Sequence, residues 1–501
     1  MRHEILRLIV SNHVHYSFIQ GPQLASFLLS LFLLVQCLII QRRYNPKTEE
    51  MFFVNISQKF GLFCVYLPSK KCFMAIRYKS IILGYYVPSF FEMHIDTYKN
   101  DLTITGLSVK DQTILFHEYI HFLQDFTTYY GLSAIYAYSE YIHSVVNRIY
   151  TVKTSEFHVP FVIQDNNDNV LLNQQILRLT QGDSEECNNF AVTNVLQDKD
   201  PLLINPYMKE IPSVILNPNG DLRNFGALAI MESMAYILER LCSLAGVAKS
   251  PDYPYRSAEL VAEHYNSKFG KNLMMVLALC DMSLQNSNPG ACFVRVMKEI
   301  KENRIKFSTP EEVYDYFYDQ ELLDANGKTY LLLSGFKKLL KTVQSCMKSY
   351  LRDMPIVEEY YKWIDNLAHF AIDWRENDRY FLLRMARYPE LAKNDCWGKA
   401  VHDVGTPLMS NNNEQYFKIP QAGAKLGMDV EYFKAIKQIV NLLEKGKVEC
   451  NMFKWCSHSP NATPNEQCEK TPWLKISEER LCPYALLWKH WKLSDKKPIV
   501  K

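Results

Sequence analysis

The chain has 501 residues, of which 48% are hydrophobic and 22% charged, a composition typical of a globular protein with a substantial core. Its formal net charge is only +2, which excludes the strongly basic surface expected of a nucleic-acid-binding protein. The 18 glycines beside 31 tyrosines and 27 phenylalanines favour a compact, helix-rich body over a disordered chain. The thirteen cysteines mostly stand singly in apolar stretches, which favours a reducing compartment.

The first distinctive stretch is residues 24–40, LASFLLSLFLLVQCLII, which are apolar or small apart from Gln36. The run is short for a membrane-spanning helix and long for the apolar part of a signal peptide. Arg42 and Arg43 follow it directly, which weakly favours a cytoplasmic body behind a signal anchor. Two alternatives stay open, a hydrophobic leader of another kind and an extension outside the folded unit. We therefore treat residues 1–80 as a hydrophobic N-terminal extension or membrane anchor.

Residues 81–107 are β-rich and are expected to form short strands. Residues 111–131, DQTILFHEYIHFLQDFTTYYG, follow with the pattern of a largely buried helix. We expect Ser108 to cap the start of this helix and Gly131 to end it. Residues 132–150 are expected to form a second helix.

The first of these helices contains the H-E-x-x-H motif, at residues 117–121. Because residues four apart lie on the same helix face, His117 and His121 can present two imidazoles to one ion. Glu118 lies about 100° further round the helix, close enough to reach a water on that ion. Two neutral imidazoles, one further protein ligand and an open position for water suit Zn²⁺. The motif therefore predicts a zinc site in which Glu118 is the general base for a metal-bound water.

Two histidines need a third protein ligand, and two glutamates are candidates. Glu232 lies in a strongly apolar helical pattern with small neighbours, where a buried carboxylate needs a partner such as a metal cation. Glu140 lies 19 positions after His121 on the next predicted helix, among polar and aromatic residues typical of a surface acid. We favour Glu232 and keep Glu140 as the alternative. The other interpretation of Glu232 is an ion pair with Arg240 or Arg223.

The H-E-x-x-H helix and a second, glutamate-bearing helix together resemble the gluzincin type of zincin metallopeptidases. The spacing of Glu140 matches that of aminopeptidase-type gluzincins, whereas Glu232 resembles the gluzincin ligand in its local chemistry. The resemblance covers two short helices, and it implies a zinc-dependent peptidase that acts on peptide or protein substrates. Two alternatives stay open: a non-peptidase or inactive zincin scaffold that serves as a binding protein, and a membrane-tethered helical interaction protein.

Further residues are candidates for supporting roles in such a site. His369, Tyr380 and His402 are of the right type to donate to a developing oxyanion. Gln124 and Asp125, one turn beyond the motif, are candidates to orient a metal ligand.

Across the whole chain, the patterns predict an α+β protein that is predominantly α-helical, with a short β-sheet before the H-E-x-x-H helix. We expect a zincin-like catalytic core at residues 81–250, a helical domain at 251–445 and a tail rich in Cys and Trp at 446–501, packed on the body.

The tail contains four cysteines, Cys450, Cys456, Cys468 and Cys482. Their spacings lack the C-x2-C pair typical of structural zinc sites. The pattern therefore favours free thiols, with a closed zinc site and disulfides as the alternatives.

Overall fold

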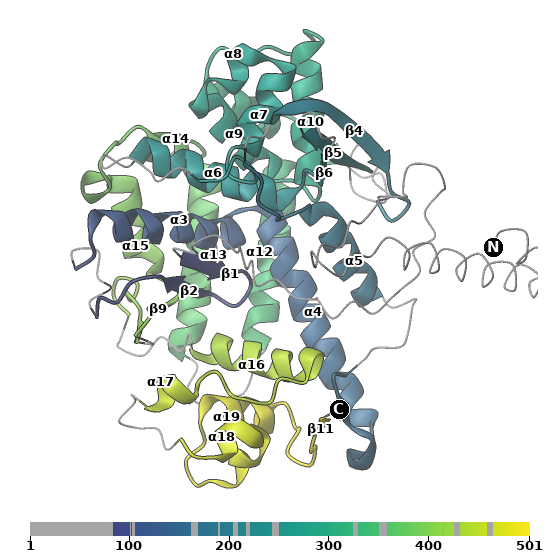
Figure 1. Ribbon diagram of the computed structural model, residues 1–501, viewed down its shortest axis with the longest axis vertical. Helices are drawn as coiled ribbons and strands as arrows, with labels where there is room; N and C mark the ends of the chain where they lie inside the picture. The colour runs from purple at the N-terminus through teal and green to yellow at the C-terminus, as the bar shows by residue number, and fades with distance from the viewer. Residues whose placement is uncertain are drawn as a thin grey trace, which may run out of the picture. The chain divides into compact units, whose positions relative to one another are not determined.

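The computed structural model is predominantly α-helical with several small sheets, which confirms the predicted α+β class (Figure 1). It describes residues 84–100, 102, 106–161, 169–188, 191–203, 209–216, 221–242, 250–323, 329–349, 358–413, 415–424, 431–457 and 464–500. All of these belong to one unit of the chain, Met74–Lys501. The predicted hydrophobic segment 24–40 lies outside the described residues. Within the described part, every helix is too short or too polar to cross a membrane.

The elements keep the labels of Figure 1. The helices are α3 (Val109–Thr127), α4 (Tyr129–Thr151), α5 (Asn169–Gln181), α6 (Ala227–Cys242), α7 (Ser257–Tyr265), α8 (Ser267–Gly270), α9 (Leu273–Ser283), α10 (Pro289–Lys301), α11 (Pro310–Tyr318), α12 (Leu332–Ser349), α13 (Glu358–Asn377), α14 (Phe381–Ala386), α15 (Asp395–Val404), α16 (Glu431–Lys445), α17 (Phe453–Ser457), α18 (Gln467–Lys470) and α19 (Pro483–His490), with short 3-10 turns η1 (Thr154–Glu156), η2 (Leu391–Lys393) and η3 (Pro472–Ser477). The strands are β1 (Gly84–Val87), β2 (Glu92–Ile95), β3 (His158–Val159), β4 (Val192–Lys199), β5 (Glu210–Leu216), β6 (Asp221–Asn224), β7 (Glu321–Leu323), β8 (Thr329–Leu331), β9 (Leu408–Ser410), β10 (Tyr416–Phe417) and β11 (Ile499–Val500).

Strands β1 and β2 form an antiparallel hairpin before the motif helix α3, within the region where the sequence predicts short strands. Beyond β2, the sheet continues with β9 and β10 in the order β1-β2-β9-β10, and β2 runs parallel to β9. This pairing joins segments more than 300 residues apart and crosses the predicted boundary at residue 250. The parallel pairing of β3 with β11 crosses the predicted boundaries at both 250 and 445. The predicted domain boundaries themselves stay predictions.

The turn between β1 and β2 anchors the hairpin in the aromatic core. Phe91 adopts a positive φ of 52°, which costs energy for a residue with a side chain. Its fully buried ring makes edge contacts with Phe122 of α3, Trp363 of α13 and Phe433 of α16, at centroid distances of 6.0, 5.4 and 4.8 Å. Burial against three helices offsets the backbone strain and fixes the hairpin beside α3.

Helix α3 begins where the sequence predicts. The hydroxyl of Ser108 accepts a hydrogen bond of 3.1 Å from the backbone N–H of Asp111, which satisfies one of the free donors of the first turn. The helix then runs through the H-E-x-x-H motif without interruption to Thr127.

The predicted stop at Gly131 is wrong. Helix α3 ends at Thr127, and Thr128, in an extended conformation, starts α4, its hydroxyl accepting from the N–H of Gly131 at 3.0 Å. Gly131 therefore lies in the first turn of α4. A Cβ atom there would come within 2.4 Å of the carbonyl oxygens of Gln124 and Asp125. Glycine is needed at this position for the close approach of α4 to the end of α3, and not to terminate a helix.

A buried ion pair holds the C-terminal end of α3. Arg375 of α13 makes two hydrogen bonds of 2.7 Å to the carboxylate of Asp281 in α9, and both side chains are fully buried. The Nε of the same guanidinium donates to the carbonyl oxygen of Thr127 at 2.7 Å. A paired cation thus satisfies a last-turn carbonyl of the motif helix and favours its negative dipole end.

We predict opposite effects for alanine at two helical glycines. Gly131→Ala should destabilise the protein by about 1–3 kcal/mol, because backbone must move to admit the methyl group. Gly398→Ala is the matched control, because Gly398 is exposed in α15 and its Cβ would meet nothing within 4 Å. This control should be neutral or stabilising by about 0.5–1 kcal/mol. Denaturant unfolding measures both, and equal effects of the two substitutions would contradict the close packing of α4 on α3.

We also predict a pH dependence from Glu92 of β2, which accepts from Lys434 at 2.8 Å and from Lys437 at 2.7 Å, both in α16. Burial disfavours the ionised carboxylate, but the two lysines outweigh burial and lower the pKa of Glu92 to about 2. A depressed pKa stabilises the fold above the unfolded value of about 4.5, and up to about 3 kcal/mol is lost as the pH falls towards the folded value. The difference in unfolding free energy between wild type and Glu92→Gln should therefore narrow between about pH 5 and pH 3. A constant difference across this range would contradict the assignment.

Candidate metal centre

Helix α3 presents two imidazoles on one face, one helical turn apart. The rings of His117 and His121 lie 5.0 Å apart between centroids, and their Nε2 atoms face each other at 3.3 Å. Both residues are buried, at 8% and 7% exposure. Most of α3 is enclosed by protein, so the surrounding packing restrains the two rings.

Helix α6 lies beside α3 and supplies a carboxylate to the same point (Figure 1). The Oε2 atom of Glu232 lies 3.3 Å from Nε2 of His117 and 3.4 Å from Nε2 of His121. The three donor atoms thus form a nearly equilateral triangle. A tetrahedral ion with ligand distances of about 2.0–2.1 Å requires a separation of about 3.3–3.4 Å between its donors. His117, His121 and Glu232 form a buried group that could hold a metal ion.

The outer nitrogens of the two rings determine which tautomers are present. The Nδ1 of His117 lies 3.0 Å from a carboxylate oxygen of Glu239, which can only accept when ionised. The Nδ1 of His121 lies 2.7 Å from Oε1 of Gln124, whose Nε2 donates to the carbonyl oxygen of Met231 at 3.0 Å and so fixes the amide orientation. Each Nδ1 therefore carries a proton, so that in the neutral form of each ring the lone pair of Nε2 points inward.

Three acceptor atoms therefore converge, and a positive charge must stabilise them. Burial alone favours the neutral imidazole of His117, but hydrogen bonds to Glu232 and Glu239 outweigh it and raise the pKa of that imidazole well above its usual value. Burial likewise opposes ionisation of Glu232, and the two imidazoles reverse this and lower the pKa of its carboxyl group. A proton and a metal cation therefore compete for the same position between these residues.

Glu118 lies next to this group and is itself buried, at 8% exposure. Burial raises the pKa of its carboxyl group to about 7, although the neighbouring His117 and His121 act in the opposite direction. The edge strand β1 packs against it. A Cβ atom on Gly84 would come within 3.1 Å of Cγ of Glu118 and within 2.7 Å of Ile114. A glycine at this position lets the sheet edge lie close to the carboxylate.

Glu140, the alternative third ligand, lies outside the metal-binding group. Glu140 of α4 is half-buried, and its Oε1 lies 4.0 Å from the sulfur of Cys346 in α12. The two arginines considered as alternative partners of Glu232 form ion pairs with other residues. Arg240 pairs with Glu259, and Arg223 pairs with Glu185.

The supporting residues suggested by the sequence divide into two groups. Gln124 contacts His121, as predicted, whereas Asp125 accepts hydrogen bonds from the hydroxyl of Tyr86 and the backbone N–H of Ser89 at 2.8 and 2.7 Å, which secures the β1–β2 turn. The three candidate oxyanion donors lie away from the metal-binding group. His369 is exposed, Tyr380 donates to Asp315, and His402 pairs with the adjacent Asp403.

Sequence reasoning missed Tyr255 and the role of Glu239. The ring of Tyr255 lies 6.0 Å from that of His117, and burial together with the charges of Glu232 and Glu118 raises the pKa of its phenol. Tyr255 lies in a loop before α7, and no motif marks it. Glu239 carried a signal, because it lies two helical turns after Glu232 and therefore on the same face of α6.

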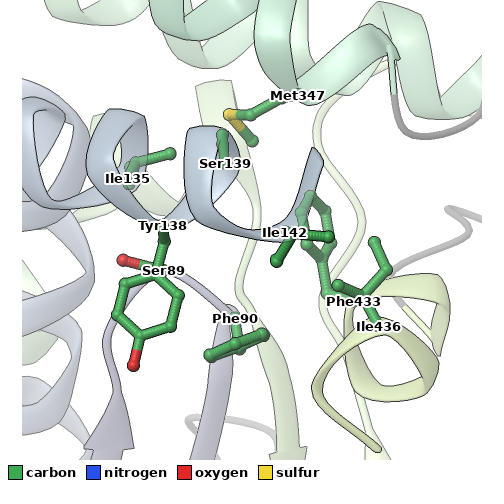
Figure 2. A pocket seen from close by; sticks show the side chains of 9 residues that line it. All are labelled: Ser89, Phe90, Ile135, Tyr138, Ser139, Ile142, Met347, Phe433 and Ile436. Atoms are coloured by element: carbon green, nitrogen blue, oxygen red, sulfur yellow. The ribbon is translucent and has the colours of Figure 1, made fainter. Parts of the chain in front are cut away.

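Two pockets lie outside the metal-binding group. A small enclosed pocket lies where α4, α12 and α16 meet the β1–β2 turn, and Figure 2 shows its mainly apolar walls. No carboxylate, imidazole or thiol lines it, the lining residues being Ser89, Phe90, Ile135, Tyr138, Ser139, Ile142, Met347, Phe433 and Ile436. A more open groove runs along α15, beside Trp397 and His402.

Comparison of the chain with protein-family models, with curated proteins and with solved structures finds no match. Function is therefore inferred from the geometry of the metal-binding group and the chemistry of its residues.

We predict that Glu239→Gln weakens metal binding at this group by about 10–100-fold, because the N–H of His117 loses its charged acceptor. Glu232→Gln should weaken binding more, because it replaces a ligand. Competition for zinc with a chromophoric chelator measures both affinities. Glu140→Gln is the matched control and should bind as wild type does. If Glu140→Gln weakened binding and Glu232→Gln did not, the assignment of the third ligand would be wrong.

Proposed function

We propose that the protein is a zinc-dependent hydrolase of the metallopeptidase type. One observation carries the proposal: three inward-facing acceptor atoms, from His117, His121 and Glu232, lie 3.3–3.4 Å apart beside a buried glutamate. A set of two imidazoles and one carboxylate leaves a fourth position open, as catalytic zinc sites do. Zinc, when bound, lowers the pKa of a coordinated water towards neutrality and polarises a carbonyl group.

Glu118 is the proposed proton carrier. Its pKa of about 7 in the absence of a cation is close to the value at which one carboxyl group can both accept and release a proton near neutral pH. In the hydrolysis of an amide, Glu118 would take a proton from water and deliver it to the leaving amine. Glu118 lies close to strand β1 and interacts electrostatically with all three proposed ligands, His117, His121 and Glu232.

Tyr255 is the proposed donor to the oxyanion. Among the described tyrosines and histidines considered for this role, it is the one whose ring lies near a ligand, 6.0 Å from His117. Its raised pKa keeps the phenol protonated, and a protonated phenol can donate a hydrogen bond to a developing negative charge.

Peptide or protein substrates and a cytoplasmic location complete the proposal. The substrate class follows from the resemblance of the two ligand-bearing helices to gluzincins. All ten cysteines of the described residues are free, in keeping with a reducing compartment. Residues 24–40 would then serve as a membrane anchor or as an extension outside the folded unit.

We predict that Glu118→Gln keeps bound zinc but lowers hydrolysis of a fluorogenic peptide library by at least about 100-fold, because the variant cannot take the proton. Zinc content by elemental analysis and the initial rate are measured on the same sample.

Asp125→Asn is the matched control. Asp125 lies on the same helix, is equally enclosed and also has a pKa raised by burial to about 7, but it contacts the β1–β2 turn. The side-chain oxygen of asparagine can still accept from Tyr86 and Ser89, so this variant should hold the turn and retain activity. A Glu118→Gln variant as active as wild type would exclude the peptidase proposal. If wild type and Glu118→Gln both contained zinc and neither hydrolysed the peptides, a binding scaffold would be favoured.

A further inference from the structure

Helix α6 carries more than the third metal ligand on the face that it turns towards the metal-binding group. From the helical period, Tyr236 lies about 40° and Arg240 about 80° round the axis from Glu232, so the three side chains share one side of the helix. Glu239, on the same side, contacts His117. An arginine therefore lies about two turns beyond a proposed zinc ligand, and the proposed reaction does not use it.

A row of aromatic rings connects this arginine with the metal-binding group. The ring of Tyr255 lies 6.0 Å from that of His117, and the ring of Tyr236 meets Tyr255 edge-on at 5.8 Å. The guanidinium carbon of Arg240 lies over the ring of Tyr236, 5.4 Å from its centroid. Because Tyr236 precedes Arg240 by about one turn, the long side chain runs back along α6 towards Glu232. The guanidinium is thus directed towards the proposed zinc site.

Two contacts hold the guanidinium of Arg240 in place. Its Nη1 donates at 2.5 Å to Oε1 of Glu259 in α7, whose carboxylate is buried. Its stacking on Tyr236 is the second contact, a cation–π interaction. A guanidinium has five N–H donors in one rigid plane, and the ion pair with Glu259 engages one nitrogen. Because the Arg240 side chain is 29% exposed, part of this fixed cation can meet a ligand.

The acids around the metal-binding group restrict where an anionic group of a substrate can lie. Glu118, Glu232 and Glu239 are close enough to interact electrostatically with one another. Each ionised carboxylate repels another anion at short range. Arg240 offers the opposite charge, and a planar guanidinium matches the two oxygens of a carboxylate.

We propose that Arg240 is a specificity-determining residue that binds a carboxylate of the substrate two or three residues from the cleaved bond. A helical rise of about 1.5 Å per residue separates the Cα atoms of Glu232 and Arg240 by about 12 Å, and the side chain leans back over part of this distance. An extended peptide spans about 3.3–3.6 Å per residue, so two or three residues cover the rest. An acidic side chain and a C-terminal carboxylate offer the same chemistry. The inference rests on the function proposed above.

Cleavage of synthetic peptides by the full, zinc-loaded chain tests this specificity. Mass spectrometry of a digested random-sequence library identifies the cleaved bonds, and matched peptides that differ only in Glu or Gln near the bond are then compared. Wild type should favour the carboxylate by about 10–100-fold in kcat/KM, as expected of a charge-assisted hydrogen bond. A C-terminally amidated copy of the library distinguishes the two sources: lost cleavage assigns the terminal carboxylate, and an unchanged preference for Glu assigns a side chain.

Substitution of the arginine tests the assignment to Arg240. Arg240→Gln should lower the preference about 10-fold or more, whereas Arg223→Gln, the matched control at a partly exposed arginine paired with Glu185, should keep it. Because Arg240→Gln leaves the buried Glu259 without its cation, the double substitution Arg240→Gln/Glu259→Gln is measured as well. The double variant should recover stability and still lack the preference. A restored preference would show that the arginine only neutralises Glu259, and it would overturn the proposal.

Binding to the Glu118→Gln variant separates this result from the proposed function. The same library is passed over the immobilised, zinc-loaded variant, and the retained peptides should be enriched in the carboxylate, because binding does not require the proton carrier. Selective retention without hydrolysis by wild type would contradict the hydrolase proposal and support the carboxylate site. Equal retention and equal cleavage of Glu and Gln peptides would overturn the role of Arg240, as would a library of which nothing is retained or cleaved.

Discussion

The contact of the Glu232 carboxylate with the imidazoles of His117 and His121 is the interaction on which the metal-binding group depends. Glu232, 3% exposed in an apolar helix, is stable as a carboxylate only with a compensating charge, and its Oε2 lies 3.3 and 3.4 Å from the Nε2 atoms of His117 and His121. Gln124 and Glu239 fix those rings from outside, and Gln124 also ties α3 to the backbone of α6. The arrangement is electrostatically incomplete without a cation, whether proton or metal.

The surrounding fold keeps α3 in place at both ends and along its side. Ser108 caps its start, and the buried Arg375–Asp281 pair binds its last carbonyl. Asp125, one turn beyond the motif, holds the β1–β2 turn and thereby the edge strand that lies against Glu118. Because these contacts lie outside the metal-binding group, the position of α3 is set by packing and hydrogen bonding and not by the ion. A pre-formed triangle of donors is the expected result.

Local rules were sufficient for part of this account. Helix periodicity alone places His117 over His121, and the need of a buried acid for a partner singles out Glu232. Three features depend on contacts that no local pattern encodes. Strand β2 pairs with β9, which lies more than 300 residues away in the sequence. Gly131 is required because α4 packs closely against the end of α3. Tyr255 lies in a loop whose position beside His117 is set by tertiary packing. The sequence indicated the composition of the metal centre, and only tertiary packing determines its surroundings.

The central claim is that His117, His121 and Glu232 hold a zinc ion. Anomalous diffraction at the zinc absorption edge, from crystals of the protein purified without chelators, tests it most directly. The account predicts one anomalous peak about 2.0–2.2 Å from both Nε2 atoms and from an oxygen of Glu232. Well-ordered side chains with no peak between them, in crystals soaked with zinc, would contradict it.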